Sequence, residues 1–154
     1  MKPPYPAPDF SLVSSDDMRH TLADYVGKWL VLYFYPKDDT PGCTIEACSL
    51  RDARSEIASL GAEIVGISMD TPESHEVFRS KHDLPFVLLS DPMGETIRAY
   101  GAWGKKMFGH EGILRKTFII DPEGQIQKVY GRVTPLGHGE QIASDIKQLQ
   151  LLRK

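Results

Sequence analysis

The two cysteines of this 154-residue chain, Cys43 and Cys48, lie five residues apart in the stretch TPGCTIEAC. Thr40 can cap a helix, Pro41 suits the first helical position and Gly61 suits the stop, so the pattern predicts one helix that carries both thiols. A five-residue step along a helix separates two Cα atoms by about 8.7 Å, whereas a disulfide needs roughly 4.4–6.8 Å. The thiols therefore either never bond, or bond only after the helix unwinds locally.

Cys43 falls in the first turn of this predicted helix. Unpaired backbone N–H groups and the positive end of the helix dipole lie there, and they favour a thiolate. Glu46, three residues on, opposes the thiolate, so we expect a further cation nearby. Thr40 offers a hydroxyl that could donate to the sulfur or to a bound oxygen ligand. A free cysteine more often packs as a small hydrophobic residue, but the Pro-Gly-Cys helix start after an apolar strand favours redox chemistry.

The helical periodicity also predicts where the two thiols point. The core-facing stripe consists of Leu50, Ala53, Ile57 and Leu60. Cys43 projects about 20° beyond one edge of this stripe, at the boundary between core and solvent. Cys48 projects roughly 140° away from Cys43, on the far side from the stripe.

The elements that must position this helix follow from the hydrophobic pattern. Apolar runs over 28–36, 62–70 and 86–91 predict buried strands, and proline-initiated or amphipathic segments over 71–84, 93–101 and 138–152 predict helices. Residues 10–25 predict a short hairpin followed by a helical turn, and 116–131 predict a second hairpin around Asp-Pro-Glu-Gly. Strands alternating with helices predict an α/β fold with a mixed central sheet in one domain over 1–154, an order that a thioredoxin-like fold requires.

Composition excludes several classes of function. The net charge is −3 and basic residues are not concentrated, which argues against nucleic-acid and membrane-surface binding. The start of the chain lacks the apolar region of a signal peptide, and no apolar run is long enough to span a bilayer. We therefore expect a soluble cytoplasmic protein, in which two cysteines are not a structural staple.

The stretch YPKDDTPGCTIEAC resembles the active-site segment of peroxiredoxins, whose pattern Pro-x-x-x-Thr-x-x-Cys is met by Pro36, Thr40 and Cys43. The second cysteine five residues later resembles the bacterioferritin-comigratory, or peroxiredoxin Q, branch. APDFSL, VGISMD, LPFVLLSD and GILRKTFIID extend the likeness over essentially residues 5–150. It implies a thioredoxin-like peroxiredoxin fold.

The resemblance also implies roles for these residues. Cys43 matches the peroxidatic cysteine, Thr40 and Pro36 match the pocket around it, Arg115 matches the active-site arginine, and Cys48 matches the resolving cysteine. The implied activity is reduction of hydrogen peroxide and organic hydroperoxides through a Cys43 sulfenic acid, an intrachain disulfide with Cys48, and recycling by thioredoxin or a similar dithiol. A monomer and no metal or organic cofactor are expected.

Other readings make different predictions. A thioredoxin-like thiol–disulfide oxidoreductase is the main alternative, although the chain has no CxxC motif and no proline directly before TFIID. A redox-inert binding domain on the same scaffold would tolerate loss of Cys43. The five histidines form no HExxH motif or Cys/His cluster, so a metal site is not predicted. We expect Trp103, Met107 and Phe108 to pack in the core or at its edge.

Overall fold

Strand β4 (Trp29–Phe34) lies within an eight-stranded sheet of the computed structural model, which describes residues 2–106 and 109–152. The strand order is β1-β10-β9-β4-β5-β6-β2-β3, and β7 and β8 form a separate pair. The strands are β1 (Tyr5–Pro6), β2 (Ser11–Ser14), β3 (Arg19–Thr21), β4, β5 (Ala62–Ser68), β6 (Val87–Ser90), β7 (Trp103–Lys105), β8 (Glu111–Ile113), β9 (Lys116–Ile120) and β10 (Gln125–Tyr130). The helices are the 3₁₀ turn η1 (Leu22–Tyr25), α1 (Pro41–Ser59), α2 (Pro72–His82), α3 (Glu95–Ala99) and α4 (His138–Leu152).

The sheet is mixed, as predicted. β4 pairs with β5 and β5 with β6 in parallel, each through a helical crossover, whereas β9 pairs antiparallel with β4. The predicted strands, helices and hairpins all form. The short strands β1, β7 and β8 were not predicted. This arrangement of strands and helices is a thioredoxin-like fold.

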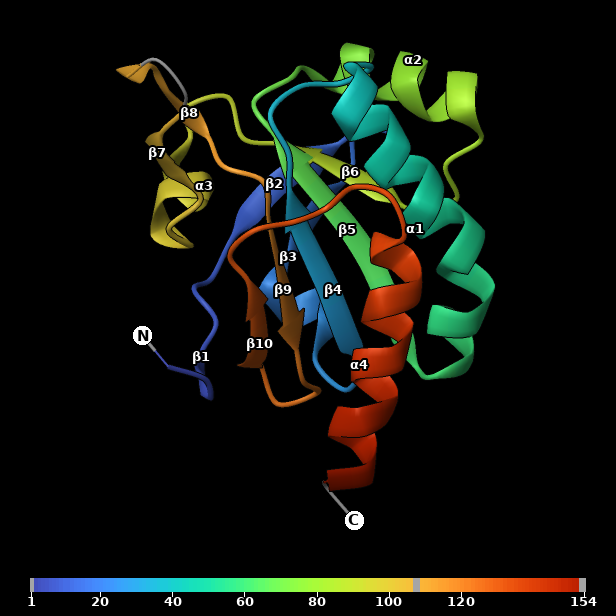
Figure 1. Ribbon diagram of the computed structural model, residues 1–154. Coiled ribbons are helices and arrows are strands. Elements are labelled where there is room, and N and C mark those ends of the chain that lie inside the picture. Colours follow the sequence, from blue (N-terminus) through green and yellow to red (C-terminus); the bar gives the residue numbers. More distant parts are fainter. Residues whose placement is uncertain (1, 107–108, 153–154) are drawn as a thin grey trace.

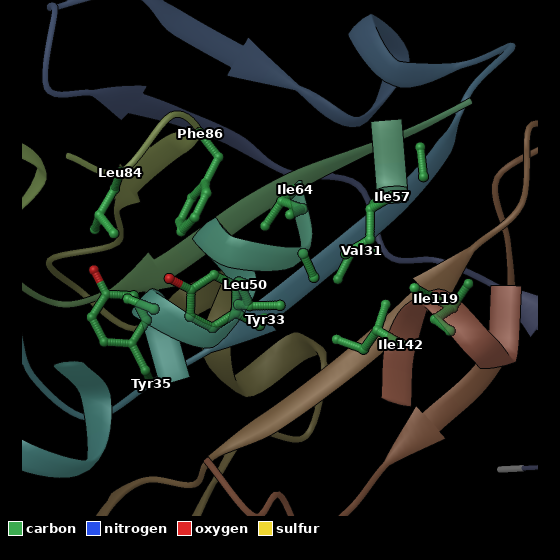
Figure 2. Close-up of a cluster of buried hydrophobic side chains, with 14 of the residues drawn as sticks. Val31, Tyr33, Tyr35, Leu50, Ile57, Ile64, Leu84, Phe86, Ile119 and Ile142 are labelled. Carbon is green, nitrogen blue, oxygen red and sulfur yellow. The ribbon is translucent and has the colours of Figure 1, made fainter. Parts of the chain in front are cut away.

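Both faces of β4 are buried, which explains its unbroken apolar run. Val31, Tyr33 and Tyr35 pack with α1, α2 and α4 in one core cluster, while the alternate positions Leu32 and Phe34 pack with η1 and α3 in another. Figure 1 shows α1, α2 and α4 on one side of the sheet and α3 with β7 and β8 on the other. Figure 2 shows the first cluster, where side chains of β4 meet those of α1 and α4.

No helix within residues 2–106 and 109–152 combines the length and hydropathy needed to cross a membrane. Trp103 is half-buried and packs against the second core cluster, with the Arg98 guanidinium 4.4 Å from its ring centre. This agrees with packing at the core edge. Met107 and Phe108 lie outside the described residues.

Candidate active site

The loop over 35–40 leads from the carboxyl end of β4 to the start of α1. Asp39 has a φ of 58°, a left-handed conformation that aspartate tolerates better than most residues, and it turns the chain into the helix. Thr40 is the N-cap residue, and the Thr44 N–H donates to its carbonyl at 2.8 Å. The amides of Gly42 and Cys43 precede that first intrahelical hydrogen bond, so they are available near the sulfur.

Cys43 is more deeply buried than the helical periodicity predicted. Its exposed fraction is only 2%, and it belongs to the core cluster that contains Tyr33 and Leu50. The prediction of a boundary position is wrong because it considered α1 alone. Tyr33, from β4, and Arg115, from the segment before β9, add contacts that the periodicity of one helix does not include.

Arg115 supplies the cation that Glu46 made necessary. Its Nη2 donates to the Cys43 Sγ at 3.4 Å, and its Nη1 donates to the Glu46 Oε1 at 2.7 Å. The antiparallel register pairs Phe34 with Lys116, so the residue before β9 arrives beside the end of β4, where α1 begins. Burial opposes its charge, but Cys43 and Glu46 more than offset this, and the pKa of Arg115 is raised.

The burial of Glu46, which contacts Arg115, was not predicted from the sequence. Its side chain is fully buried, and its Oε2 has no hydrogen-bond partner among the described residues. Burial raises its pKa to about 7, although the nearby Arg115 lowers it. Its position one turn after Cys43, on the same side of the helix, was the only signal in the sequence.

The raised pKa of Glu46 predicts a pH-dependent stability. The folded state holds this proton more tightly than the unfolded chain, where the ordinary pKa is 4.5, so the stabilisation is lost as pH rises from about 4.5 to about 7. At about 1.4 kcal/mol per pH unit, the free energy of unfolding falls by about 3 kcal/mol from this group. Denaturant unfolding of the reduced protein from about pH 4 to about pH 8 measures this loss.

Glu46→Gln removes this titration, so the wild type should lose about 3 kcal/mol more than the variant over that range. Glu73→Gln, which removes an exposed carboxylate on α2, is the matched control and should leave the pH dependence unchanged. Parallel curves for the wild type and Glu46→Gln would contradict the assignment.

Thr40 and Pro36 lie in the loop between β4 and α1. The Thr40 hydroxyl donates to the Lys37 carbonyl at 2.9 Å, so its single hydrogen is engaged and its lone pairs remain available. In this structure the hydroxyl hydrogen is therefore directed to the loop and not to the sulfur, and a contact of Thr40 with a bound ligand stays a prediction. Pro36 is half-buried one residue beyond Tyr35, and its contact with the peroxide pocket stays a prediction.

Gly42 leaves room for the arginine. A Cβ at this position would lie 3.0 Å from the Arg115 Nη2, so alanine should push the guanidinium aside by a few tenths of an ångström. We expect Gly42→Ala to lower kcat/KM for peroxide by roughly fivefold, because displacing an oriented group weakens transition-state contacts. Thermal unfolding should show no loss of stability, since alanine favours a helix. Unchanged kinetics would show that the arginine position is not critical.

Tyr33 is a second residue that the sequence reasoning did not single out. Its hydroxyl is buried without a hydrogen-bond partner among the described residues, on the face of β4 that packs against α1. Burial, followed by the charges of Glu46 and Cys43, raises the pKa of Tyr33. The hydroxyl therefore stays protonated near the Cys43 sulfur.

Cys48 lies on the same continuous helix as Cys43, and both thiols are free. It is half-buried and lines a groove of about 640 Å³ together with Ile45, Leu136 and Glu140. The sequence prediction of separated thiols on an intact helix is therefore confirmed. With Cα atoms about 8.7 Å apart on a regular helix, a disulfide requires that α1 opens.

A thioredoxin-like fold with a buried thiol in the first turn of a helix and a guanidinium on its sulfur fits the peroxiredoxin class of thiol peroxidases. The family model described as the AhpC/TSA family matches residues 4–129. The chain belongs to this family and is a peroxiredoxin, with thiol peroxidase activity.

Individual relatives place the chain beside the Bcp and Q peroxiredoxins. It is 44% identical over 146 residues to Peroxiredoxin Bcp of Bacillus subtilis, covering 93% of each chain. It is 39% identical over 145 residues to Peroxiredoxin Bcp of Escherichia coli, covering 92% of this chain and 93% of the other. A structure of Xanthomonas campestris Peroxiredoxin Q superposes with a TM-score of 0.86 at 37% identity, covering 90% of both chains.

Proposed function

We propose that the chain reduces hydrogen peroxide and organic hydroperoxides through Cys43, resolves the product with Cys48, and is recycled by thioredoxin or a similar dithiol. The observation that carries this proposal is the 3.4 Å contact between the Arg115 Nη2 and the Cys43 Sγ in the first turn of α1. The guanidinium at the helix start stabilises a thiolate and also offers donors to an anion beside it. Cleavage of a peroxide bond requires both, because a thiolate attacks and negative charge grows on the peroxide oxygens.

In the first step, the Cys43 thiolate attacks the terminal oxygen of the hydroperoxide. A sulfur–oxygen bond forms, the oxygen–oxygen bond breaks, and the departing oxygen takes up a proton to leave as water or an alcohol. Arg115 and the amides at the start of α1 stabilise the negative charge that grows on the peroxide oxygens. The Thr40 lone pairs accept the hydrogen of the peroxide and so orient it.

In the second step, the Cys48 thiolate attacks the sulfur of the Cys43 sulfenic acid. A disulfide forms and the hydroxyl leaves as water after protonation. Because α1 holds the thiols too far apart, its first turns unwind before this bond closes. A dithiol then reduces the disulfide by two thiol exchanges and becomes oxidised itself.

The substrate class and the cellular setting are part of the same proposal. A structural study of the Xanthomonas campestris bacterioferritin comigratory protein concerns its alkyl peroxide reduction activity, and that protein is 37% identical to this chain. We carry organic hydroperoxides over from it. We also propose a monomer, formed by one domain over 1–154, in the cytoplasm, where a dithiol reductant would be available.

The experiment is steady-state peroxide consumption by the wild type and by Cys48→Ser, each with thioredoxin and with a small monothiol. We expect the wild type to turn over with thioredoxin and Cys48→Ser to turn over only with the monothiol, because the sulfenic acid stays accessible but no intrachain disulfide forms. Ser55→Ala, an exposed position on the same helix, is the control and should match the wild type. Undiminished turnover of Cys48→Ser with thioredoxin would contradict the resolving role.

A further inference from the structure

A buried polar network fixes the residues that join β4 to α1. The Asp38 carboxylate accepts hydrogen bonds from the Tyr35 hydroxyl at 2.6 Å and from the Ser74 hydroxyl at 2.8 Å. The His75 Nδ1 lies 2.7 Å from the same carboxylate. Tyr35 and Asp38 flank Pro36, whereas Ser74 and His75 belong to α2, so the network ties the loop to another helix.

His75 is fully buried, and both of its ring nitrogens are engaged. Its Nε2 lies 3.1 Å from the Leu89 carbonyl, which can only accept, so this nitrogen carries a hydrogen. Its Nδ1 lies at hydrogen-bond distance from the Asp38 Oδ2, so one hydrogen lies between these two atoms. Because the imidazole bridges β6 and Asp38, its ring has one orientation.

Asp38 is fastened through its backbone as well. Its N–H donates to the Asp70 Oδ2 at 2.8 Å, and the Ser68 hydroxyl donates to the same oxygen at 2.6 Å. Ser68 is the last residue of β5 and Asp70 follows shortly after it. Asp38 is therefore bonded both to the end of the sheet and to α2. The chain direction at this point is therefore strongly constrained.

A second anchor lies downstream in α1, beyond Cys48. The Gly139 N–H donates to the Ser49 Oγ at 2.9 Å, and a Cβ on Gly139 would lie only 2.3 Å from the Ser49 carbonyl oxygen. α1 and α4 are thus in backbone contact at this point. The segment that has to move when the two thiols bond is bounded by Asp38 on one side and Ser49 on the other.

We propose that His75, acting through Asp38, is a positioning residue that holds the loop over 36–40 in the peroxide-reactive arrangement and delays the opening of α1. This role rests on the proposed function. The loop carries Pro36 and Thr40, so fixing Asp38 places both against the first turn of the helix. Without the network, the loop loosens, peroxide attack slows, and Cys48 reaches the sulfenic acid sooner.

The delay has a measurable chemical consequence. A Cys43 sulfenic acid that stays in the folded site can react with a second hydroperoxide, which transfers its terminal oxygen to the sulfur and leaves as an alcohol or water, giving a sulfinic acid. Disulfide formation with Cys48 competes with that reaction. The yield of sulfinic acid at high peroxide therefore reports how long α1 stays closed.

The test compares wild type with His75→Leu, which fills a similar volume without hydrogen bonds. We expect the rate constant for peroxide attack to fall roughly tenfold, because the loop that orients the substrate is no longer fixed. The rate constant for disulfide closure should rise, because α1 is no longer held closed, and the sulfinic acid yield by mass spectrometry should fall severalfold. Equal values for wild type and variant, or a parallel fall in both rate constants, would overturn this role.

Two further variants separate positioning from general stability. Asp38→Asn keeps hydrogen bonds to Tyr35 and His75 and should retain the wild-type rate constants and sulfinic acid yield. Asp38→Ala should show the values expected for His75→Leu. If His75→Leu does not fold, this pair of variants tests the role instead. Ile97→Val, buried in the other core cluster, should cost stability without changing the sulfinic acid yield. The same pattern in Ile97→Val would overturn the positioning role.

The wild type distinguishes failure of the peroxidase function from failure of the positioning role of His75. If it forms no sulfenic acid with peroxide, the proposed function fails and this role fails with it. If the wild type forms the sulfenic acid and the disulfide while His75→Leu behaves identically, only the role of His75 is wrong.

Discussion

Replacing Cys43 with serine should reduce peroxide consumption by at least about a thousandfold, to the background of the assay without enzyme. A serine hydroxyl at this position cannot supply the thiolate that attacks the peroxide, and neither Arg115 nor the helix start can ionise it at neutral pH. The measurement is dithiol-dependent peroxide consumption, with Cys43→Ala as a second variant because a buried hydroxyl can disturb the core. Far-ultraviolet circular dichroism checks that both variants fold.

Full activity of either Cys43 variant would contradict the assignment of the reactive thiol. It would also revive the redox-inert binding domain, which tolerates loss of this cysteine. Activity that depends on Cys48 alone would point instead to the side of α1 that lines the groove.

Replacing Arg115 with lysine should lower kcat/KM for peroxide by about a hundredfold. The arginine reaches the Cys43 Sγ and the Glu46 Oε1 with different nitrogens, 3.4 and 2.7 Å away, whereas a lysine ammonium is a single point charge that cannot hold the same geometry at both. Loss of one preorganised donor to a developing anion typically costs about 10²–10³ in rate. Initial rates at subsaturating peroxide measure the effect.

The companion variant Arg115→Met tests how Glu46 responds. Removing one partner of a buried ion pair usually costs about 3–5 kcal/mol, because the other charge is left unpaired. Here the pKa of Glu46 is already about 7 with the arginine present, so without it the carboxyl protonates at neutral pH and the loss of stability should be smaller. The double variant Arg115→Met with Glu46→Gln should therefore be about as stable as Arg115→Met. Strong additional stabilisation in the double variant would show that Glu46 stays charged.

The helix that carries the thiols could be predicted because its signals are local. Thr40, Pro41 and the apolar stripe each indicate the helix within a few residues. An unbroken apolar run indicates β4, because its alternate residues pack in two core clusters, one on each face of the sheet. The position of Cys43 in the first turn follows from the same local rules. So does the incompatibility of a Cys43–Cys48 bond with an intact helix.

The environment of the sulfur could not be derived in this way. Arg115 is 72 residues away in sequence from Cys43, and only the antiparallel register of β4 and β9 brings it to the helix start. From the sequence pattern alone, Arg115 would be expected to be a solvent-exposed arginine. Only the family resemblance assigned it to the site. The burial of Glu46 likewise arises from packing between α1 and the sheet, and so does that of the Tyr33 hydroxyl, which has no hydrogen-bond partner within residues 2–106 and 109–152. Helical periodicity does not encode this packing.

The central claim is that two thiols kept apart by one intact helix become bonded after reaction with peroxide. The tryptic peptide over 38–51 contains both cysteines and no internal cleavage site, so its mass and alkylation state report the outcome directly. After one equivalent of peroxide, the peptide should be lighter by two hydrogens and resist thiol alkylation, and a dithiol should restore both properties. A wild-type peptide that keeps two alkylatable thiols, or that retains a stable sulfenic acid on Cys43, would contradict the account.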